Sequence, residues 1–438
     1  MTDKKKLLIY AHYYVPDVAS TGQLLKDLAE GISDTFDITI ICTVPSYSGI
    51  IEDKYKKQSV YLENRNGVKV IRIRVPEFKK GKKISRIKNI ISYYFGALHA
   101  TTKIGPYDYV LTISQPPVLG GMLGLRSCRL LHRIHHRKPK FIYCIQDFNP
   151  EQVIAVGYFK NKLLLSLLMI IDKRTCRKSD LVITVGRDLL VTLKNRFENK
   201  QVPKHIMINN WVDEKEIYPL SSDCDDVRAF QKQYGLLTDK QEARFTIMYS
   251  GNIGLYYDLE NLIRIIRKFK DAKTKPSHKY PNGRMVLFVF VGAGSLENML
   301  KSYVKEHHMN NVIFIPYQDK EKLNYSLNAA DVHWCVNAQG MKGVSCPSKY
   351  YGIAAAGKPI IGVLERGTEV RYLIEQTQGG LVCDPGNYGK IEETIQWFLE
   401  HDGSDLLTAM GERNRAYLLE NLTKEMSIRK YKKAIEEL

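Results

Sequence analysis

The chain has 438 residues, of which 44% are hydrophobic and 26% charged, and its formal net charge is +18 at pH 7. This length favours two domains, and the composition is that of a globular chain, which excludes a disordered protein and a polytopic membrane protein. The eight cysteines show no C-x-x-C pair and no metal-ligand spacing, so we expect neither a disulfide framework nor a zinc site.

Apolar strand-like runs alternate with helix-like segments in the first half of the chain. Strands are expected at residues 7–11, 38–41, 68–73, 109–113, 141–145 and 181–185, and helices at about 23–32 and 85–101. This alternation predicts a parallel, doubly wound α/β sheet, which binds ligands at loops after the strands. The start, where three lysines lead straight into the first strand, lacks the long apolar region of a signal peptide, so we expect a cytoplasmic protein.

Positive charge is concentrated in the first half: residues 1–220 hold 36 Lys and Arg against 20 Asp and Glu, and residues 221–438 hold 29 against 27. One basic stretch precedes apolar and aromatic residues, and it contains Lys79, Lys80, Lys82, Lys83, Arg86 and Lys88. A second contains Arg126, Arg129, Arg133, Arg137, Lys138 and Lys140. These patterns favour an anionic membrane surface over nucleic acid, for which no recognition motif is present; a solvated basic face is the alternative for at least one of them.

A second αβ series follows a polar stretch near residues 213–240. Its strands are expected at 245–249, 286–291, 312–315, 331–336 and 359–363. We therefore predict a first domain at 1–215, completed by a C-terminal helix at about 415–438 that packs back on it, and a second domain at 216–414.

Glycines end two strands of the second series and allow a ligand to approach the backbone. The Gly251-Asn252 turn offers N–H groups and a side-chain amide. The Gly292-Ala293-Gly294 turn lacks the third glycine of a dinucleotide fingerprint, and an ordinary tight βα turn is the alternative. Walker, G-x-S-x-G and H-E-x-x-H patterns are absent, which removes the main support for kinase and hydrolase functions.

The segment from Cys346 to Gly362 is predicted to be a loop, a short helix and a buried strand. Ser348 is a candidate N-cap and Gly357 can end the helix. The helix start beside Lys349 would attract an anion, which makes this a candidate diphosphate site. An ordinary αβ unit with a surface lysine is the alternative.

Three positions in the first half have a functional and a structural interpretation each. Asp147, after a strand, could orient or accept a proton from a hydroxyl, or cap the next helix. His12 could hydrogen-bond at a cleft or pack among tyrosines. Gly22 could admit a phosphate or sugar to a helix N-terminus or simply permit the turn.

Taken together, these motifs resemble the retaining glycosyltransferases of family 4. The shared residues are, in chain order, Pro16 with Thr21-Gly22, Asp147–Glu151 with Gly157, Ser179-Asp180, Asn210–Asp213 with Pro219, Tyr249–Gly254, Val291–Gly294, Ala329–Asp331 and Gly357-Lys358-Pro359. The likeness spans nearly the whole chain. It is greatest to the branch that builds capsule and O-antigen units, including transferases that use N-acetylfucosamine-type donors.

The resemblance implies the GT-B fold, with two Rossmann-like domains facing a catalytic cleft. It implies catalytic roles for Asp147, Lys349 and His12, and acceptor contacts from Thr21, Gly22, Gln23 and Ser114. It implies a donor site formed by Gly251, Asn252, Gly292, Gly294, Pro316, Tyr317, Gln318, Ser348, Lys349, Tyr350 and Glu369. Lysine and helix N–H groups would neutralise the leaving diphosphate, so no metal or other cofactor is expected.

The chain departs from the family pattern at two glutamates, whose places are taken by Val344 and Gly352. The first of these glutamates usually contacts the donor sugar and the second the ribose. Glu369 is a candidate replacement, with a solvated loop carboxylate as the alternative. The usual arginine and lysine after the glycine-rich turn are absent too, which gives Lys349 more weight and leaves a weak or inactive enzyme as an alternative.

These observations lead to one expected function and two rivals. We expect a cytoplasmic glycosyltransferase, peripheral on the inner face of the membrane. It would move a sugar from an NDP-sugar, UDP-linked, to a polyprenyl-diphosphate-linked saccharide in cell-surface polysaccharide synthesis. A UDP-sugar 2-epimerase of the same fold and a non-catalytic sugar-nucleotide or lipid-binding protein are the alternatives. A homo-oligomer is left open, and no nucleic-acid partner is expected.

Overall fold

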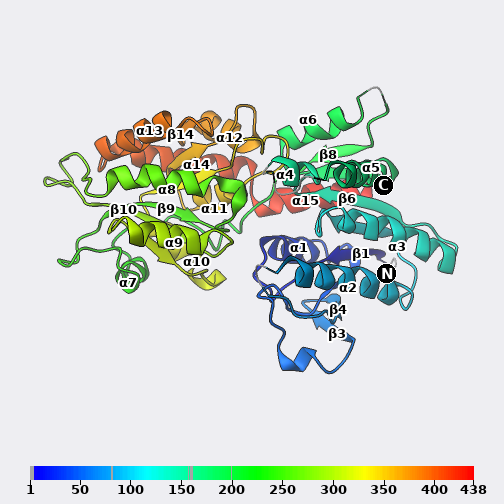
Figure 1. The fold of residues 1–438 in the computed structure, drawn as a ribbon. Helices are drawn as coiled ribbons and strands as arrows, with labels where there is room; N and C mark the ends of the chain where they lie inside the picture. Colours follow the sequence, from blue (N-terminus) through cyan, green and yellow to red (C-terminus); the bar gives the residue numbers. More distant parts are fainter. Residues whose placement is uncertain (1–3, 80–81, 156, 158–160, 199) are drawn as a thin grey trace. The chain divides into compact units, whose positions relative to one another are not determined.

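The chain folds into two compact units in the computed structural model, which describes residues 4–79, 82–155, 157, 161–198 and 200–438 (Figure 1). Unit 1 runs to Asn209 and also contains Gly343–Ser345 and Glu425–Leu438. Unit 2 contains Asn210–Lys342 and Cys346–Lys424. The first unit therefore ends at Asn209, where the sequence suggested 215, and its returning segment begins at Glu425, where the sequence suggested about 415.

Unit 1 is built on an eight-stranded sheet in the order β3-β4-β2-β1-β5-β6-β7-β8. The strands are β1 (Lys5–Ala11), β2 (Phe36–Thr43), β3 (Val60–Arg65), β4 (Val68–Ile73), β5 (Tyr109–Ile113), β6 (Lys140–Ile145), β7 (Leu181–Thr184) and β8 (His205–Met207). Seven of them are parallel, as expected for a doubly wound sheet, and β3 pairs antiparallel with β4. The central strands are mostly apolar, and apart from the two lysines that begin β1 they are buried, because both faces of the sheet are covered.

The edge strand β3 was absent from the expected elements. It joins β4 through Asn66 and Gly67, which have φ of +51° and +83°. Asn-Gly with both residues at positive φ is the preferred two-residue hairpin turn. The pair is therefore a sequence signal that could have predicted this strand.

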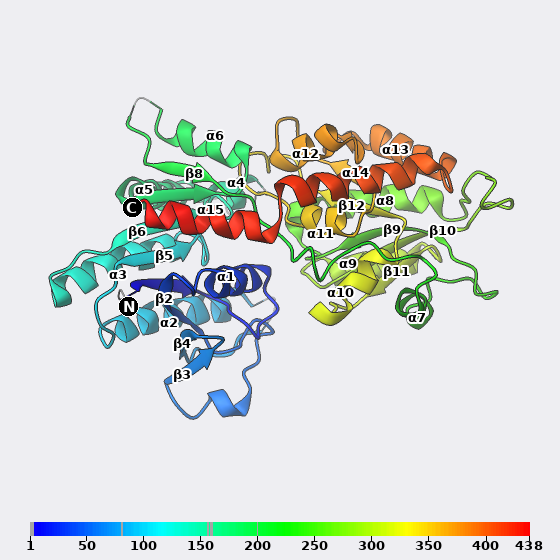
Figure 2. The ribbon, with the colours of Figure 1, turned by 180° about the vertical axis from the view of Figure 1, so that it is seen from behind.

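In the described part of unit 1, seven helices cover the two faces of the sheet. They are α1 (Ser20–Gly31), α2 (Lys83–Thr101), α3 (Leu119–His135), α4 (Glu151–Ala155), α5 (Lys162–Lys178), α6 (Arg187–Arg196) and α15 (Lys424–Glu436). Helices α2, α3 and α5 lie side by side, with α3 in the middle, on the near side of the sheet in Figure 1. Helix α15 lies on the other face, in front of the sheet when seen from behind in Figure 2.

The C-terminal helix α15 completes the core of unit 1. The Tyr431 hydroxyl lies 3.1 Å from the Cys144 thiol at the end of β6. Ile428 packs against Gly31 of α1 so closely that a Cβ there would lie 2.9 Å from its side chain. The helix therefore packs back on the first unit, as expected.

Unit 2 has a six-stranded, fully parallel sheet in the order β11-β10-β9-β12-β13-β14. Its strands are β9 (Phe245–Ser250), β10 (Val286–Val291), β11 (Val312–Ile315), β12 (Val332–Val336), β13 (Ile360–Val363) and β14 (Gly380–Cys383). Its helices are α7 (Asp225–Gln233), α8 (Leu259–Ile266), α9 (Glu297–Glu306), α10 (Lys320–Asn328), α11 (Lys349–Ala355), α12 (Glu369–Thr377), α13 (Tyr388–Glu400) and α14 (Asp405–Asn421).

Apolar clusters fill both faces of the unit 2 sheet. Alternation along β9 sends Phe245, Ile247 and Tyr249 to the cluster under α8, α9 and α13, and Met248 to a cluster under α7. Two parallel sheets covered by helices on both faces are the architecture predicted from the sequence. Among the described residues, no helix has the length and apolarity that crossing a membrane requires.

Candidate functional site

Helix α11 carries the lysine that the sequence singled out. Tyr350 and Tyr351 are fully buried, and Lys349 begins the helix at its more open end. Gly357, with φ of +63°, follows the helix in the left-handed conformation and ends it as expected. Ser348 occupies the N-cap position but has helical backbone angles and makes no capping bond with its side chain. Since a cap needs an extended backbone at that residue, the expected N-cap is not formed.

The Lys349 ammonium lies against two neighbouring aromatic rings. Its Nζ is 3.8 Å from the centroid of the Tyr257 ring and 5.0 Å from that of Tyr249. Loss of hydration lowers the pKa of Lys349 to about 8, with a small opposing effect of the Cys335 thiol. At neutral pH the group is still charged, and a poorly hydrated cation in a low-dielectric setting attracts an anion more strongly than one in water.

Two glycine turns are stacked beside this lysine at the ends of β9 and β10. Gly251 has φ of +141°, and a Cβ there would lie 2.8 Å from the Lys349 Cε. Gly292 has φ of +135°, and a Cβ there would lie 2.0 Å from the Gly251 carbonyl oxygen. Gly294 packs equally closely, since its Cβ would lie 2.1 Å from the Ile253 oxygen. Packing between the two turns therefore requires glycine at these positions. This agrees with the interpretation of Gly292-Ala293-Gly294 as an ordinary tight βα turn.

Hydrogen bonds fix the same turns. The Gly251 N–H donates to the Val291 oxygen over 2.8 Å, and the Ile253 N–H donates to the Ala293 oxygen over 3.0 Å. The Tyr249 hydroxyl donates to the Asn252 oxygen over 2.6 Å, which fixes the ring that faces Lys349. Asn252 itself leaves its side chain exposed.

The other residues expected at the donor site differ in how far they are buried. Gln318 is buried, and its side chain bonds to the Pro316 oxygen over 2.8 Å and to the Tyr234 hydroxyl. Tyr317 between them is exposed. Glu369 is only 2% exposed and lies in the first turn of α12, so the alternative of a solvated loop carboxylate is wrong.

The two positions that lack the family's glutamates differ in structure. Val344 belongs to unit 1, where its carbonyl oxygen accepts the Phe148 N–H over 2.8 Å. Gly352 lies in α11, and a Cβ there would be in ordinary contact, 3.4 Å from the Leu327 Cδ1. Packing around its Cβ therefore does not by itself require glycine at residue 352.

In unit 1, the residues expected to contact the acceptor lie where β1 and β5 end. Thr21 donates to the Gln115 side chain over 2.9 Å, and the Gln23 amide donates to the Asp17 oxygen over 3.3 Å. A Cβ at Gly22 would lie 3.0 Å from the Tyr13 oxygen, so the start of α1 is packed against the loop after β1. Ser114 accepts the N–H groups of residues 146 and 147 and thereby joins the ends of β5 and β6.

His12 is buried and packed among aromatic rings. Its Nε2 lies 3.2 Å from the Asn89 Oδ1, and its ring centroid is 4.2 Å from that of Tyr13 and 5.1 Å from that of Tyr93. Burial lowers the pKa of His12 to about 4, so the imidazole is neutral at physiological pH. His12 therefore packs among tyrosines, as its structural interpretation predicted. A catalytic role for His12 stays a prediction.

Asp147 lies just after β6 and forms an isolated antiparallel bridge with Ser345. Burial raises the pKa of its carboxyl group, against the effect of hydrogen bonds from Ser345 and Gln152. A carboxylate with a raised pKa is better suited to exchange a proton near neutrality. The bond to Gln152, in the next helix, is made with its side chain, and the Gln152 N–H donates to the Phe148 oxygen instead, so this bond is not a helix cap.

A buried ionic network holds the segment that follows Asp147. Arg196 donates to Glu151 over 2.8 and 2.6 Å and to Asp172 over 2.5 Å. Its guanidinium lies 4.2 Å from the centroid of the Phe148 ring, and it also donates to the Asn149 oxygen. The residues that the resemblance emphasised at 148–151 thus serve to fix this loop.

The segment Gly343–Ser345 is fixed by a second buried carboxylate. The Gly343 N–H donates to Asp188 over 2.8 Å, and a Cβ at Gly343 would lie 2.2 Å from the Thr192 hydroxyl oxygen. This segment precedes Lys349 by only a few residues. Asp188 therefore anchors the chain just before the loop that carries the lysine.

Sequence reasoning gave no role to Tyr257, Arg196 or Asp188, and it noted Tyr249 only as part of a shared motif. Tyr249 reads as part of an apolar strand, and Tyr257 follows a turn. Only their approach to Lys349 in space gives them a role. The arginine and the aspartate lie on α6, which carried no recognisable motif.

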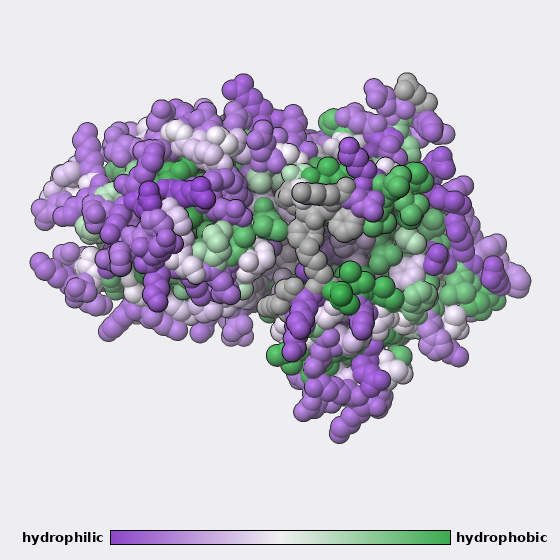
Figure 3. Space-filling view, viewed as in Figure 1, coloured by the Kyte–Doolittle hydropathy of each residue, from purple (hydrophilic) through white to green (hydrophobic). Residues whose placement is uncertain are grey.

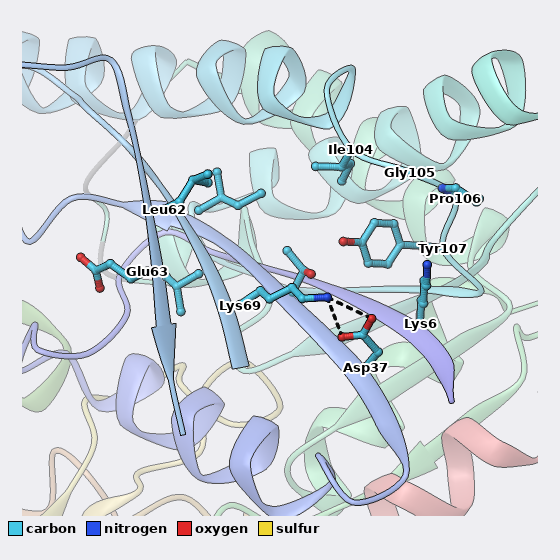
Figure 4. Close-up of a pocket in the computed structure, with 12 residues that line it drawn as sticks. Lys6, Asp37, Leu62, Glu63, Lys69, Ile104, Gly105, Pro106 and Tyr107 are labelled. Carbon is cyan, nitrogen blue, oxygen red and sulfur yellow. Dashed lines mark hydrogen bonds and ion pairs between the residues drawn. The ribbon is translucent and has the colours of Figure 1, made fainter. Parts of the chain in front are cut away.

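A hollow of about 350 Å³ lies in unit 1 at the edge of the sheet where the parallel strands begin, opposite the edge where they end (Figure 4). It is lined by residues at the starts of β1, β2 and β4, including Lys6, Asp37 and Lys69, with Tyr107 facing them. Lys69 and Asp37 form an ion pair across 3.2 Å. None of the residues expected to bind the acceptor lines this hollow.

Residues 238–417 match the family model described as glycosyl transferases group 1. Over 83% of both chains, the protein is 24% identical to a Pseudomonas aeruginosa protein described as the glycosyltransferase WbjE. It is 23% identical to an Escherichia coli (strain K12) protein described as the colanic acid biosynthesis glycosyl transferase WcaI, over 86% of this chain and 88% of that one.

Solved structures share the fold over nearly the whole chain. Sucrose-phosphate synthase from Thermosynechococcus elongatus has a TM-score of 0.72 at 14% identity and covers 99% of both chains. Anabaena HepE in complex with UDP and glucose has a TM-score of 0.68 at 12% identity, over 99% of this chain and 100% of that one. WaaG, a glycosyltransferase involved in lipopolysaccharide biosynthesis, has a TM-score of 0.65 at 12% identity, over 98% and 99%.

The two parallel-sheet units are those of the GT-B fold, as the likeness to these structures shows. A group 1 glycosyltransferase domain in the second unit and two glycosyltransferase relatives along more than four fifths of the chain identify the protein as a glycosyltransferase enzyme.

Proposed function

We propose that this enzyme transfers a sugar, with retention of configuration, from a UDP-sugar to a polyprenyl-diphosphate-linked saccharide during cell-surface polysaccharide synthesis. The observation that carries the proposal is Lys349, a poorly hydrated cation that contacts two tyrosine rings beside the Gly251 turn. Cleavage of a glycosyl–phosphate bond develops negative charge on the leaving diphosphate. A fixed cation that faces this charge stabilises the transition state more than the ground state.

The relatives support the choice of donor and pathway. HepE is described in complexes with UDP-glucose and with UDP, and WcaI and WaaG are described in colanic acid and lipopolysaccharide biosynthesis. In the proposed site the diphosphate binds beside the glycine turn at 251, and Lys349 neutralises it. Asp147 and the residues around Ser114 face the acceptor in unit 1. Lysine and backbone N–H groups do this work without a metal or another cofactor.

The enzyme would act in the cytoplasm, at the inner face of the cell membrane, where a polyprenyl-linked acceptor is available. The basic first unit supports this location, because it suits both anionic lipid and a diphosphate-bearing acceptor.

The test is consumption of a UDP-sugar that depends on a lipid extract containing the acceptor. We expect turnover with the extract, little without it, and little change when EDTA is added. Lys349→Ala should lower turnover by about a hundredfold or more. The matched control is Lys268→Ala, which removes an exposed lysine of the same unit that pairs with Glu392.

Each rival function gives a different result. Turnover without any acceptor would indicate an epimerase, and binding of UDP-sugar without turnover would indicate a non-catalytic protein. Normal turnover of the Lys349→Ala variant would remove the leaving-group role of this lysine. Loss of activity in EDTA would assign the diphosphate to a metal.

A further inference from the structure

Helix α5 exposes an apolar face to solvent. Leu163, Leu167 and Ile170 are 85%, 52% and 63% exposed and recur at helical spacing. The opposite face, with Asp172 and Cys176, is buried against the sheet. Figure 3 looks onto this side of unit 1 and shows apolar surface over α5. Exposed leucines in such a row indicate an interaction surface.

Helix α2 repeats this arrangement on the far side of α3. Ile84, Ile87, Ile91 and Phe95 are exposed along one side of the helix. Tyr93, on the other side, is buried and donates to the Ile41 oxygen of β2. Both helices therefore present an apolar ridge directed away from the sheet.

Helix α3, between them, presents arginines. Arg126, Arg129 and Arg133 are exposed at helical spacing, opposite the buried side that packs on β5 and β6. The Arg126 guanidinium lies 5.7 Å from the centroid of the Tyr94 ring of α2, which ties the two helices together. The outer surface of the layer thus runs apolar, basic, apolar across three neighbouring helices.

The charge on this layer is almost entirely positive. The basic residues number three in α2, three in α3 and five in α5, and the only carboxylate is Asp172, which is bound by Arg196 inside the unit. Lys80, from the first basic stretch in the sequence, lies outside the described residues. Two copies facing each other through this layer would place positive charges together, which disfavours self-association. Nucleic acid would leave the leucine ridges in water.

We propose that the α2–α3–α5 layer is a membrane-docking surface for anionic phospholipid. The apolar ridges of α2 and α5 enter the boundary between headgroups and acyl chains, and the arginines of α3 bind lipid phosphates between them. This surface deepens the proposed function, on which it rests, because it would bring unit 1 to a lipid-linked acceptor. The sequence predicted membrane binding by the basic stretches and by the apolar residues that follow the first of them; the structure adds the apolar ridge of α5.

The experiment measures binding of the full chain to vesicles that contain neither sugar donor nor saccharide acceptor. Vesicles of phosphatidylcholine with phosphatidylglycerol are compared with vesicles of phosphatidylcholine alone. We expect binding to the anionic vesicles and at least about tenfold weaker binding to the neutral ones, since each basic side chain near the surface contributes about fivefold.

Two variants separate the apolar and the basic contributions. The triple change Leu163→Ser, Leu167→Ser and Ile170→Ser should weaken binding to both kinds of vesicle by about tenfold or more. The double change Arg129→Glu and Arg133→Glu should weaken binding to the anionic vesicles alone. The matched controls should bind like the unchanged protein: Leu62→Ser alters an exposed leucine of β3, and Lys430→Glu with Lys433→Glu alters exposed lysines of α15.

Unchanged vesicle binding by both sets of variants, with thermal unfolding like that of the unchanged protein, would overturn the proposal. So would a chain that ignores vesicles but dimerises through these residues, with the dimer lost in the triple variant. Transfer to an acceptor in detergent should be unaffected in every variant. Failure of vesicle binding therefore leaves the proposed reaction intact, and failure of the reaction leaves this surface intact.

Discussion

Replacing Lys349 by methionine should make the protein more stable and less active. Loss of hydration lowers the pKa of Lys349 to about 8 from an ordinary value of 10.5. Each pKa unit corresponds to about 1.4 kcal/mol, so keeping the ammonium charged at neutral pH costs the fold roughly 3 kcal/mol. This is an upper figure because part of the side chain reaches solvent.

The two tyrosine rings offset part of this free-energy cost of the charged ammonium. For a cation that still reaches solvent, a contact with an aromatic face contributes about 0.5–1 kcal/mol, or about 1–2 kcal/mol for the two rings together. Methionine keeps the unbranched chain and packs well against aromatic rings. We therefore expect the free energy of unfolding of the Lys349→Met variant to rise by about 1–2 kcal/mol at neutral pH.

The pH dependence has a defined sign. Because the folded-state pKa lies below the unfolded one, the unfolded chain binds more protons between about pH 8 and the ordinary lysine value. The unchanged protein therefore loses this destabilisation as the pH rises through that window, and its stability approaches that of the variant. Above pH 8, donor affinity of the free enzyme should fall by up to about tenfold per pH unit, since only the charged lysine attracts the diphosphate.

The assay combines urea unfolding at neutral and alkaline pH with turnover at neutral pH. Turnover of the Lys349→Met variant should fall by about a hundredfold or more. Lys349→Arg is the matched control, because its charge persists across the whole pH range and donor affinity should lose its alkaline fall. A methionine variant that unfolds more easily and turns over normally would show that Lys349 is a structural cation, and the reasoning would be refuted.

Three further changes test the parts that support the site. Gly292→Ala should destabilise by at least about 2 kcal/mol in urea unfolding, because its Cβ would lie 2.0 Å from a carbonyl oxygen. Gly67→Ala, where the Cβ has open space, should cost only about 1 kcal/mol, and equal losses would contradict the packing argument. Arg196→Met should cost about 3–5 kcal/mol because it leaves Asp172 buried without its ion pair; a loss below about 1 kcal/mol in the same assay would mean that the network is dispensable. Asp188→Ala should speed hydrogen exchange at the Gly343 amide by about fivefold or more, and Asp188→Asn should restore protection; unchanged exchange would place the anchor elsewhere.

Most of the fold could be predicted from the sequence because burial on both sides leaves continuous apolar runs. The strands at 68–73, 109–113, 286–291 and 312–315 coincide with those expected. The edge strand β3 was not expected because half of its residues are polar and because Leu62 and Asn64, on one side of it, are exposed to solvent. Its Asn66-Gly67 turn is a local hairpin signal that predicts a strand on each side of it.

The site could be predicted only in part. Lys349 and the glycine turns are local features of the chain, so their sequence context was enough to select them. The rings of Tyr249 and Tyr257 gain their role only from the way β9 and α11 pack, which no local pattern records. For Ser348, residue preference predicted a cap that the helical backbone at this position does not allow.

Helix α15 has a consequence for how the molecule is made. The last residues of the chain fill the core of unit 1, where Tyr431 contacts Cys144 and Ile428 packs on Gly31. Unit 1 begins the chain, but it needs residues 425–438 to complete its core. During synthesis it therefore cannot be completed until the whole of unit 2 has left the ribosome. A truncation after residue 424, or a fragment ending at residue 209, would expose one face of the first sheet. Unit 1 should accordingly gain its full stability only after unit 2 has been synthesised.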